Sequence, residues 1–114
     1  MSACLFCRIA AGEIPAQKVA ENDHALAFRD INPQAPTHVL IIPKAHLADS
    51  AAQVGAAQST ALGAVFELAA QVARAEKLDQ GWRLVTNVGA HAGQTVHHLH
   101  FHLLGGRPME WPPG

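Results

Sequence analysis

Three histidines, His98, His100 and His102, alternate with apolar residues within the run from Val96 to Leu104 of this 114-residue chain. Successive side chains on a β-strand point to opposite faces. If the run is a strand, the three imidazoles share one face and can line a cleft, while the apolar side chains enter a core. Imidazoles at this spacing suit two chemistries: metal ligation through neutral ring nitrogens, and nucleophilic attack on phosphorus beside groups that bind phosphate oxygens. The structural alternative is a buried strand whose rings are merely hydrogen-bonded.

The segment before the histidine run favours a phosphate ligand. Gly89, Gly93, Gln94 and Thr95 offer backbone N–H groups, an amide and a hydroxyl, and such groups together suit an anion. No lysine follows the glycines, so the segment is not a P-loop. No carboxylate lies beside the run to complete a catalytic metal shell with three histidines.

A second group of chemistry-bearing residues is the pair Cys4 and Cys7, separated by two residues. A lone C-x-x-C pair is a weak signal. Redox use of the thioredoxin type would require a βαβ setting after it, which the sequence does not predict. A structural zinc site would instead need four ligands, commonly two cysteines and two histidines.

The elements that must position these residues are predicted from hydrophobic periodicity and turn residues. We expect a short helix over residues 4–11, a long amphipathic helix over 51–77, and strands over 18–21, 24–29, 38–42, 82–87 and the histidine run. The long helix should bury Leu62, Val65, Phe66 and Val72. Strands in runs beside a segregated helix indicate an α+β fold, here with an antiparallel sheet of about five strands, one long helix and one short helix.

Composition limits the class of protein. Apolar residues make up 49% of the chain and charged residues 15%, which is enough for the core of one domain over residues 1–114. A net charge of -1 gives no electrostatic surface for nucleic acid or an anionic membrane. The first residues lack the basic start and long apolar run of a signal peptide. We therefore expect a cytoplasmic protein with neither a nucleic-acid nor a membrane partner.

The histidine run resembles the signature of the histidine triad (HIT) nucleotide-binding superfamily. Other segments, spread over nearly the whole chain, resemble the Hint branch of that superfamily: Gly12–Pro15, Asp30–His38, Ile42–Lys44, Gly93–Val96, Gly105–Arg107 and Trp111–Gly114. The Trp-Pro-Pro-Gly ending is close to that of the Hint branch and is absent from the dinucleoside polyphosphate hydrolase branch.

This resemblance implies a HIT-like fold, a homodimer and a purine nucleoside phosphoramidase. Such enzymes cleave a P–N bond through a nucleotidyl-histidine intermediate and release a nucleoside 5'-monophosphate such as AMP. His100 matches the nucleophile, and His102 and His38 match histidines of the phosphate site. Thr95 stands where the family usually has a serine near the leaving group, so its extra methyl group puts substrate preference in doubt.

The resemblance also implies the binding residues. Phe28 and Ile31 match apolar walls around the base, and Asp30 matches the carboxylate that holds the ribose hydroxyls. Asn87, Gly93, Gln94 and Thr95 match positions around the phosphate, and Trp111 matches a residue that reaches the partner subunit's site. Asp30 as a turn-capping carboxylate and Trp111 as a packed anchor are the structural alternatives.

Zinc-binding members of the superfamily use an N-terminal cysteine pair, a histidine after a Pro-Lys segment and the first triad histidine. The matching residues here are Cys4, Cys7, His46 and His98. With four protein ligands such a zinc would be structural, and the chemistry itself needs no cofactor. Three alternatives stay open: a dinucleoside polyphosphate hydrolase, a non-catalytic nucleotide-binding or interaction module, and a metalloenzyme that uses the triad as zinc ligands.

Overall fold

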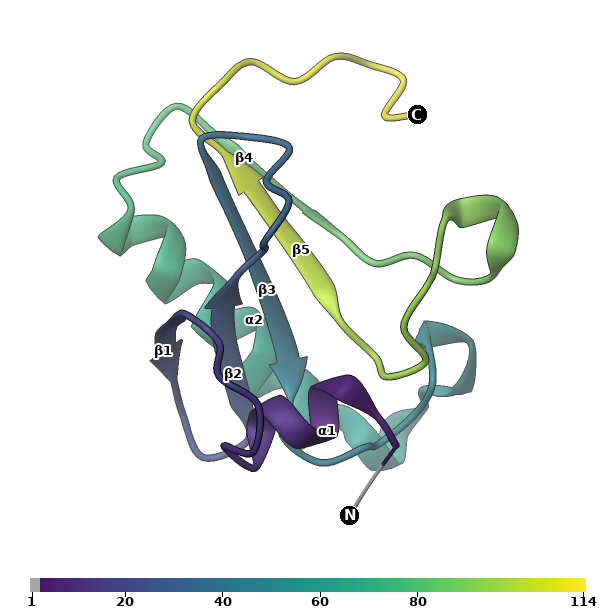
Figure 1. Cartoon of the computed structure of the whole chain (residues 1–114). Helices are drawn as coiled ribbons and strands as arrows, with labels where there is room; N and C mark the ends of the chain where they lie inside the picture. Colours follow the sequence, from purple (N-terminus) through teal and green to yellow (C-terminus); the bar gives the residue numbers. More distant parts are fainter. Residues whose placement is uncertain (1–2) are drawn as a thin grey trace.

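A five-stranded antiparallel sheet, in the order β1-β2-β3-β5-β4, forms the centre of the molecule (Figure 1). The computed structural model describes residues 3–114; Met1 and Ser2, which the predicted domain includes, lie outside the described residues. The strands are β1 Lys18–Glu21, β2 Ala25–Arg29, β3 Thr37–Pro43, β4 Trp82–Val85 and β5 Phe101–Gly105. The helices are α1 Leu5–Ala10 and α2 Ser59–Ala75, with short 3-10 turns η1 Ala51–Gln53, η2 Ala56–Gln58 and η3 Ala90–Ala92. The predicted α+β fold is confirmed.

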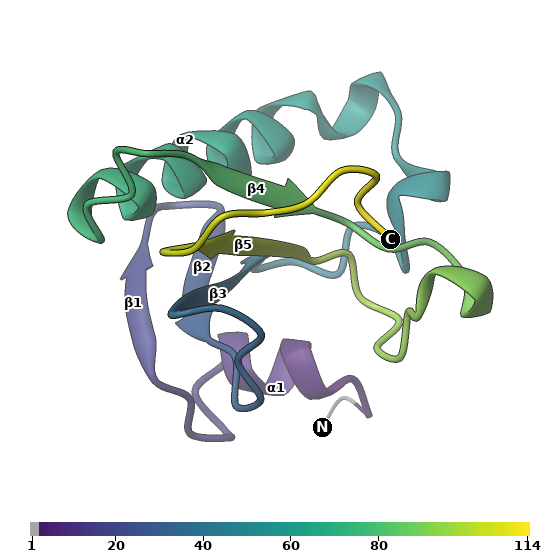
Figure 2. The ribbon, with the colours of Figure 1, turned by 90° about the horizontal axis from the view of Figure 1, so that it is seen from above.

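The two helices lie on opposite faces of the sheet (Figure 2). Alternate residues of each strand separate accordingly. On β3, Val39 and Ile41 belong to the core on the α2 side, whereas Leu40 and Ile42 pack on the other side with Phe6 of α1. The α1 side is the face that carries the histidines.

Helix α2 presents one apolar stripe to the sheet, because its buried residues recur at intervals of three and four. They are Val65, Leu68, Ala69, Val72 and Ala73. The expectation that Phe66 is core was wrong. Its side chain is 55% exposed, and only an edge of its ring meets Phe101, at a centroid distance of 5.9 Å.

The single helix predicted over residues 51–77 is also corrected, since α2 begins only at Ser59. Val54 and Gly55 are extended and separate the two 3-10 turns from each other. The Gln58 side chain accepts a hydrogen bond from the Gly55 N–H at 2.7 Å. Local side-chain bonds of this kind offer the backbone an alternative to helix, and glycine makes the extended conformation inexpensive.

The histidine strand is shorter than predicted, because regular pairing with β3 starts at Phe101. Before it the chain bends at residues 96–98 and pairs elsewhere: the Leu99 N–H donates to the Ala48 carbonyl at 2.9 Å. Leu99 still enters the core on the α2 side, and His98 and His100 still contact Phe6 on the α1 side. Among the helices of residues 3–114, none has the length and apolar character needed to cross a bilayer.

Candidate functional site

Three histidine rings lie together where β3 and β5 pair on the α1 side of the sheet. His102 stands opposite Leu40, and His38 lies one register step along on the same face. The His102 ring is 5.2 Å from the ring of His38 and 5.2 Å from that of His100, centroid to centroid. The sheet thus brings together the three histidines that sequence analysis assigned to phosphate chemistry.

Hydrogen bonds assign the protons on two of these rings. The backbone N–H of Gln34 donates to His38 Nδ1 at 3.0 Å, so in a neutral His38 the proton is on Nε2. That Nε2 lies 2.9 Å from His102 Nδ1 and donates to it. The proton of a neutral His102 is therefore on its own Nε2, which becomes a hydrogen-bond donor for a ligand.

His100 has the opposite tautomer. Its Nδ1 lies 2.7 Å from the His98 carbonyl, an acceptor only, so Nδ1 carries the proton and Nε2 keeps a lone pair. The side chain is only 7% exposed, which raises the question whether Nε2 is reachable. Within residues 3–114, the one fully buried side-chain nitrogen or oxygen that lacks a partner is Arg8 Nε. His100 Nε2, which has no hydrogen-bond partner among these residues, is therefore not fully buried.

Burial keeps the His38 and His102 rings neutral at pH 7. The pKa of His102 is lowered to about 4 by burial and by the neighbouring rings of His100 and His38. Burial also lowers the pKa of His38, against the opposing pull of Asp30. Neutral rings also agree with the hydrogen bonds, because His38 Nδ1 and His102 Nδ1 each accept a bond and therefore each need a lone pair.

Asp30 adjoins the histidines and also closes a turn. Its Oδ2 lies 3.4 Å from His38 Nε2 and 3.9 Å from His102 Nδ1, while Oδ1 accepts the Asn32 N–H at 2.8 Å. The turn-capping geometry weighed in the sequence analysis is thus present beside the histidine contact. The Arg107 guanidinium donates to the Gln34 carbonyl at 3.0 and 3.2 Å and holds this loop against the end of β5.

The predicted phosphate loop uses most of its donors internally. The N–H groups of Gly93 and Gln94 donate to carbonyls of the loop itself. The Gln94 amide spans the loop: its oxygen accepts from the Gly89 N–H at 3.0 Å, and its nitrogen donates to the Asp49 and Val96 carbonyls at 2.7 and 3.1 Å. Gln94 is therefore a brace of the loop in this structure. The side chain of Thr95 is exposed.

The other predicted binding residues, Phe28, Ile31, Asn87 and Trp111, make no hydrogen bond or ring contact with His38, His100 or His102 within residues 3–114. Phe28 is buried with its ring 5.7 Å from that of Phe6, and Asn87 is half-buried just beyond β4. Ile31 is fully exposed, and Trp111 is exposed with the Arg83 guanidinium over its ring. No ring contact or hydrogen bond of the described chain joins Ile31 or Trp111 to the histidines.

A second cluster joins Cys4, Cys7, His46 and His98, whose ligand atoms all lie within 4.8 Å of one another. The Sγ atom of Cys4 is 3.3 Å from His98 Nδ1, and that of Cys7 is 3.4 and 3.5 Å from the Nδ1 atoms of His46 and His98. Around a tetrahedral zinc with its usual Zn–S and Zn–N bond lengths, sulfur and nitrogen stand about 3.6 Å apart. The donor set therefore fits zinc in type and in spacing.

The hydrogen bonds that His46 and His98 make outside the cluster also fit a metal site. His98 Nε2 donates to the Pro43 carbonyl at 2.9 Å, and His46 Nε2 donates to Asp49 Oδ1 at 2.7 Å. In neutral His46 and His98, each bond places the proton on Nε2 and leaves the Nδ1 lone pair directed at the thiols. Metal-ligating histidines are oriented by outer acceptors in this manner.

Asp30, His38 and His102 also lie within metal-binding distance of one another, but their protons argue against a metal there. His38 Nδ1 accepts from a backbone amide, so its Nε2 holds a proton where a metal would need a lone pair. The three histidines of the run also direct Nδ1 to different partners: His98 to the cysteines, His100 to a carbonyl and His102 to His38. This arrangement disfavours the triad as one zinc site.

Three supporting residues were missed by sequence analysis. The Phe6 ring packs edge-on against His98 and His100 at 6.0 and 5.1 Å, and its place inside the C-x-x-C pair could have suggested this. The Thr86 hydroxyl donates to the His100 carbonyl at 2.8 Å, and Asp49 orients His46. Nothing in the sequence pattern marks these two.

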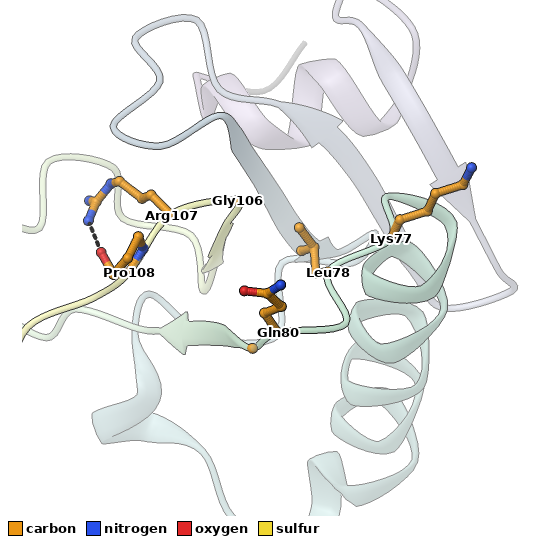
Figure 3. Close-up of a pocket in the computed structure, with 7 residues that line it drawn as sticks. Lys77, Leu78, Gln80, Gly106, Arg107 and Pro108 are labelled. Atoms are coloured by element: carbon orange, nitrogen blue, oxygen red, sulfur yellow. Dashed lines mark hydrogen bonds between the residues drawn. The ribbon is translucent and has the colours of Figure 1, made fainter.

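A cavity of about 420 Å³ lies elsewhere, beside Gly106 just beyond the end of β5 (Figure 3). Its lining includes Lys77, Leu78, Gln80 and Arg107. The Arg107 side chain is engaged there, since it donates to the Pro108 carbonyl as well as to Gln34. This cavity does not involve the histidines.

Comparisons with known proteins agree with the geometry. A HIT family hydrolase from Legionella pneumophila superposes with a TM-score of 0.93 at 55% identity, over 97% of this chain and 99% of that one. A histidine triad nucleotide-binding protein from Candida albicans has a TM-score of 0.82 at 33% identity, over 96% and 83% of the two chains. The 14 kDa zinc-binding protein of Zea mays is 47% identical over 99% of this chain and 89% of its own length.

These superpositions confirm the HIT-like fold that the sequence resemblance implied. The HIT domain model matches residues 11–109, which include all three triad histidines. The chain therefore belongs to the HIT domain family.

Proposed function

We propose that this protein is a hydrolase that cleaves purine nucleoside phosphoramidates and releases a nucleoside 5'-monophosphate through a nucleotidyl-histidine intermediate. One observation carries the proposal: His100 is held with a lone pair on an Nε2 that is not fully buried, beside the Nε2–H donor of His102. The hydrolase and nucleotide-binding names of the family members from Legionella pneumophila and Candida albicans support the reaction class.

In the first step the His100 lone pair forms a bond to phosphorus and the P–N bond of the substrate breaks. The departing nitrogen keeps that electron pair and takes up a proton from bulk solvent, relayed by the exposed Thr95 hydroxyl. The imidazole becomes positively charged as it attacks, and the His98 carbonyl on Nδ1–H stabilises that charge. The Nε2–H of His102 donates to a non-bridging phosphate oxygen.

In the second step a water oxygen bonds to phosphorus, and the bond to His100 breaks with its electron pair returning to Nε2. The water passes its proton to bulk solvent, and the monophosphate departs, leaving His100 neutral with its proton on Nδ1. The low pKa of His102 matters in both steps, because a neutral ring can donate from Nε2 to the phosphate while accepting from His38 on Nδ1. Two easier displacements replace one difficult attack by water.

Substrate binding follows the family assignment. Asp30 would hold the ribose hydroxyls through its Oδ2 oxygen, and Phe28 and Ile31 would flank the base. Gly93 and Asn87 would border the phosphate together with the backbone around Gln94 and Thr95.

A homodimer, in which Trp111 reaches the partner subunit's site, is part of the proposal. The exposed apolar rings of Phe66 and Trp82 support such an interface, because both project from the α2 side and the β4 edge of the sheet. A cytoplasmic location and a single domain over residues 1–114 complete it.

We further propose that Cys4, Cys7, His46 and His98 hold a structural zinc ion. The matching spacing and proton placement of the cluster support this, as does the name of the Zea mays relative. Zinc supplies a cross-link between α1, the segment after β3 and the start of the histidine run. No chemical step passes through it.

The test compares wild-type protein with His100→Ala and with His97→Ala, its exposed neighbour. Adenosine 5'-phosphoramidate is the substrate, and AMP release is followed by chromatography. We expect His100→Ala to lose hydrolysis but retain AMP binding, and His97→Ala to match wild type. Alkaline quenching during turnover should reveal a nucleotidyl group on the peptide that carries His100, by mass spectrometry.

Other outcomes separate the alternatives. Full activity of His100→Ala would refute the nucleophile assignment. Faster turnover of a diadenosine polyphosphate than of the phosphoramidate would favour the dinucleoside hydrolase. AMP binding without hydrolysis of either substrate by the wild-type protein would favour a nucleotide-binding module.

A further inference from the structure

Asp49 makes three hydrogen bonds, two within its own segment between β3 and α2 and one to the loop before the histidine run. Its Oδ1 accepts from His46 Nε2 at 2.7 Å, and its backbone carbonyl accepts from Gln94 Nε2 at 2.7 Å. Its backbone N–H donates to Gln53 Oε1 at 2.8 Å. One exposed residue thus lies between the Cys/His cluster and the loop before the histidine run.

Gln94 carries the contact onward into the loop. The same amide that donates to Asp49 also donates to the Val96 carbonyl, and its oxygen accepts from the Gly89 N–H. The two ends of the Gly89–Val96 loop are therefore joined through one side chain, and that side chain is anchored outside the loop at Asp49. A shift of Asp49 must move this anchor.

We propose that Asp49 is a positioning residue through which metal occupancy of the Cys4/Cys7/His46/His98 cluster sets the affinity of the Gly89–Val96 loop for a nucleotide phosphate. The inference rests on the proposed function. A metal on His46 Nδ1 fixes the ring, the ring fixes the Asp49 carboxylate through Nε2–H, and the Asp49 carbonyl holds Gln94. Linkage makes the effect reciprocal: nucleotide binding must strengthen metal binding by the same factor.

A second route between the two sites has a different consequence. His98 is both a member of the Cys/His cluster and the acceptor of the His100 Nδ1–H bond. A coupling through His98 acts on the nucleophile and changes kcat. A coupling through Asp49 acts on the loop and changes nucleotide affinity and KM, so the two routes can be told apart.

The experiment uses zinc-loaded protein. Zinc affinity is measured by competition with a chromogenic chelator, with and without saturating AMP, in wild type, Asp49→Ala, Asp49→Asn, Gln94→Ala and the control Asp79→Ala. Asp79 is an exposed carboxylate in the turn between α2 and β4. Thermal unfolding of each loaded variant checks that it is folded, and KM and kcat are measured for the phosphoramidate.

In wild type and Asp79→Ala, we expect AMP to raise zinc affinity roughly fivefold or more. Asp49→Ala should weaken zinc binding about 10- to 100-fold, as loss of an outer partner does, and should abolish the AMP effect while raising KM more than it lowers kcat. Asp49→Asn keeps an acceptor oxygen and should therefore retain most of the zinc affinity and most of the AMP effect. Gln94→Ala should leave zinc affinity unchanged yet abolish the AMP effect, and it carries the test if Asp49→Ala does not fold.

Two results overturn the inference alone: AMP binding that leaves wild-type zinc affinity unchanged, or an AMP effect that survives in Asp49→Ala and Gln94→Ala and so does not pass through either residue. Absence of both AMP binding and hydrolysis in the loaded wild-type protein contradicts the proposed function itself.

Discussion

Replacing His102 by glutamine should make the stability of this protein less sensitive to acid. The pKa of His102 in the folded protein is about 4, lowered by burial and by the rings of His100 and His38, against about 6.5 in an unfolded chain. Between these values the unfolded chain binds a proton that the folded protein does not. Stability linked to His102 is therefore present at neutral pH and is lost as the pH falls from about 6.5 towards 4.

The magnitude follows from the gap between the two pKa values. At 1.36 kcal/mol per pKa unit, the gap corresponds to a loss of about 3 kcal/mol between neutral pH and about pH 4. The His102 side chain is mostly shielded from water, so solvent screening removes only part of this. Glutamine lacks a titrating group, and the stability difference between wild type and His102→Gln should change by that amount over the same range.

Urea denaturation at a series of pH values measures this difference directly. Loss of metal ligands to protonation affects both proteins and cancels in the comparison. His91→Gln, which removes an exposed imidazole on η3, serves as the matched control and should follow wild type throughout. A difference between wild type and His102→Gln that stays constant with pH would refute the neutral, buried His102 on which the donor assignment depends.

Three further predictions concern the supports of the site. Chelator treatment should lower the unfolding temperature of wild type in scanning fluorimetry but have little effect on Cys7→Ser, because metal binding free energy adds to folding free energy. Glu76→Gln should cost about 1 kcal/mol in urea denaturation, since Glu76 accepts from Arg29 at 2.7 Å and the Arg29 hydrogen bond lowers the pKa of its carboxyl group; an unchanged midpoint would show that solvent replaces the pair. Gly105→Ala should destabilise by about 1–3 kcal/mol, because the new Cβ would lie 2.6 Å from Leu78 Cδ1, and adding Leu78→Ala should recover part of the loss; simple addition of the two effects would contradict the clash.

The sequence predicted the faces of the sheet better than the lengths of its elements. Alternation of apolar residues places Leu99, Phe101 and Leu103 in the core on the α2 side, as expected from a period of two. Periodicity failed where side chains compete with the backbone. Gln58 caps the Gly55 N–H, which breaks the helix predicted to start at residue 51, and apolar spacing carries no information about such a bond.

Phe66 shows a second limit of predicting burial from the apolar pattern of a sequence. Its position satisfies the helical stripe about as well as that of Val65, yet the ring remains more than half exposed. A single chain cannot reveal whether an apolar residue at the edge of a stripe faces its own core or another molecule. The resemblance to a homodimeric family is what suggests an occupant for this surface.

Candidate site residues were predicted by resemblance, whereas their protonation required the structure. Three alternating histidines look equivalent in sequence, but Nδ1 of each meets a different partner: the thiol of Cys4 for His98, a carbonyl for His100, and the ring of His38 for His102. The sulfur leaves His98 a lone pair for the proposed metal, the carbonyl frees the lone pair on Nε2 of His100 for the proposed attack, and the imidazole makes His102 a donor. Exchanging any two of these partners would retain the sequence motif and remove the proposed chemistry. The division of labour within the triad therefore arises from the neighbours of each Nδ1 atom, which come from α1, the backbone before β5, and β3.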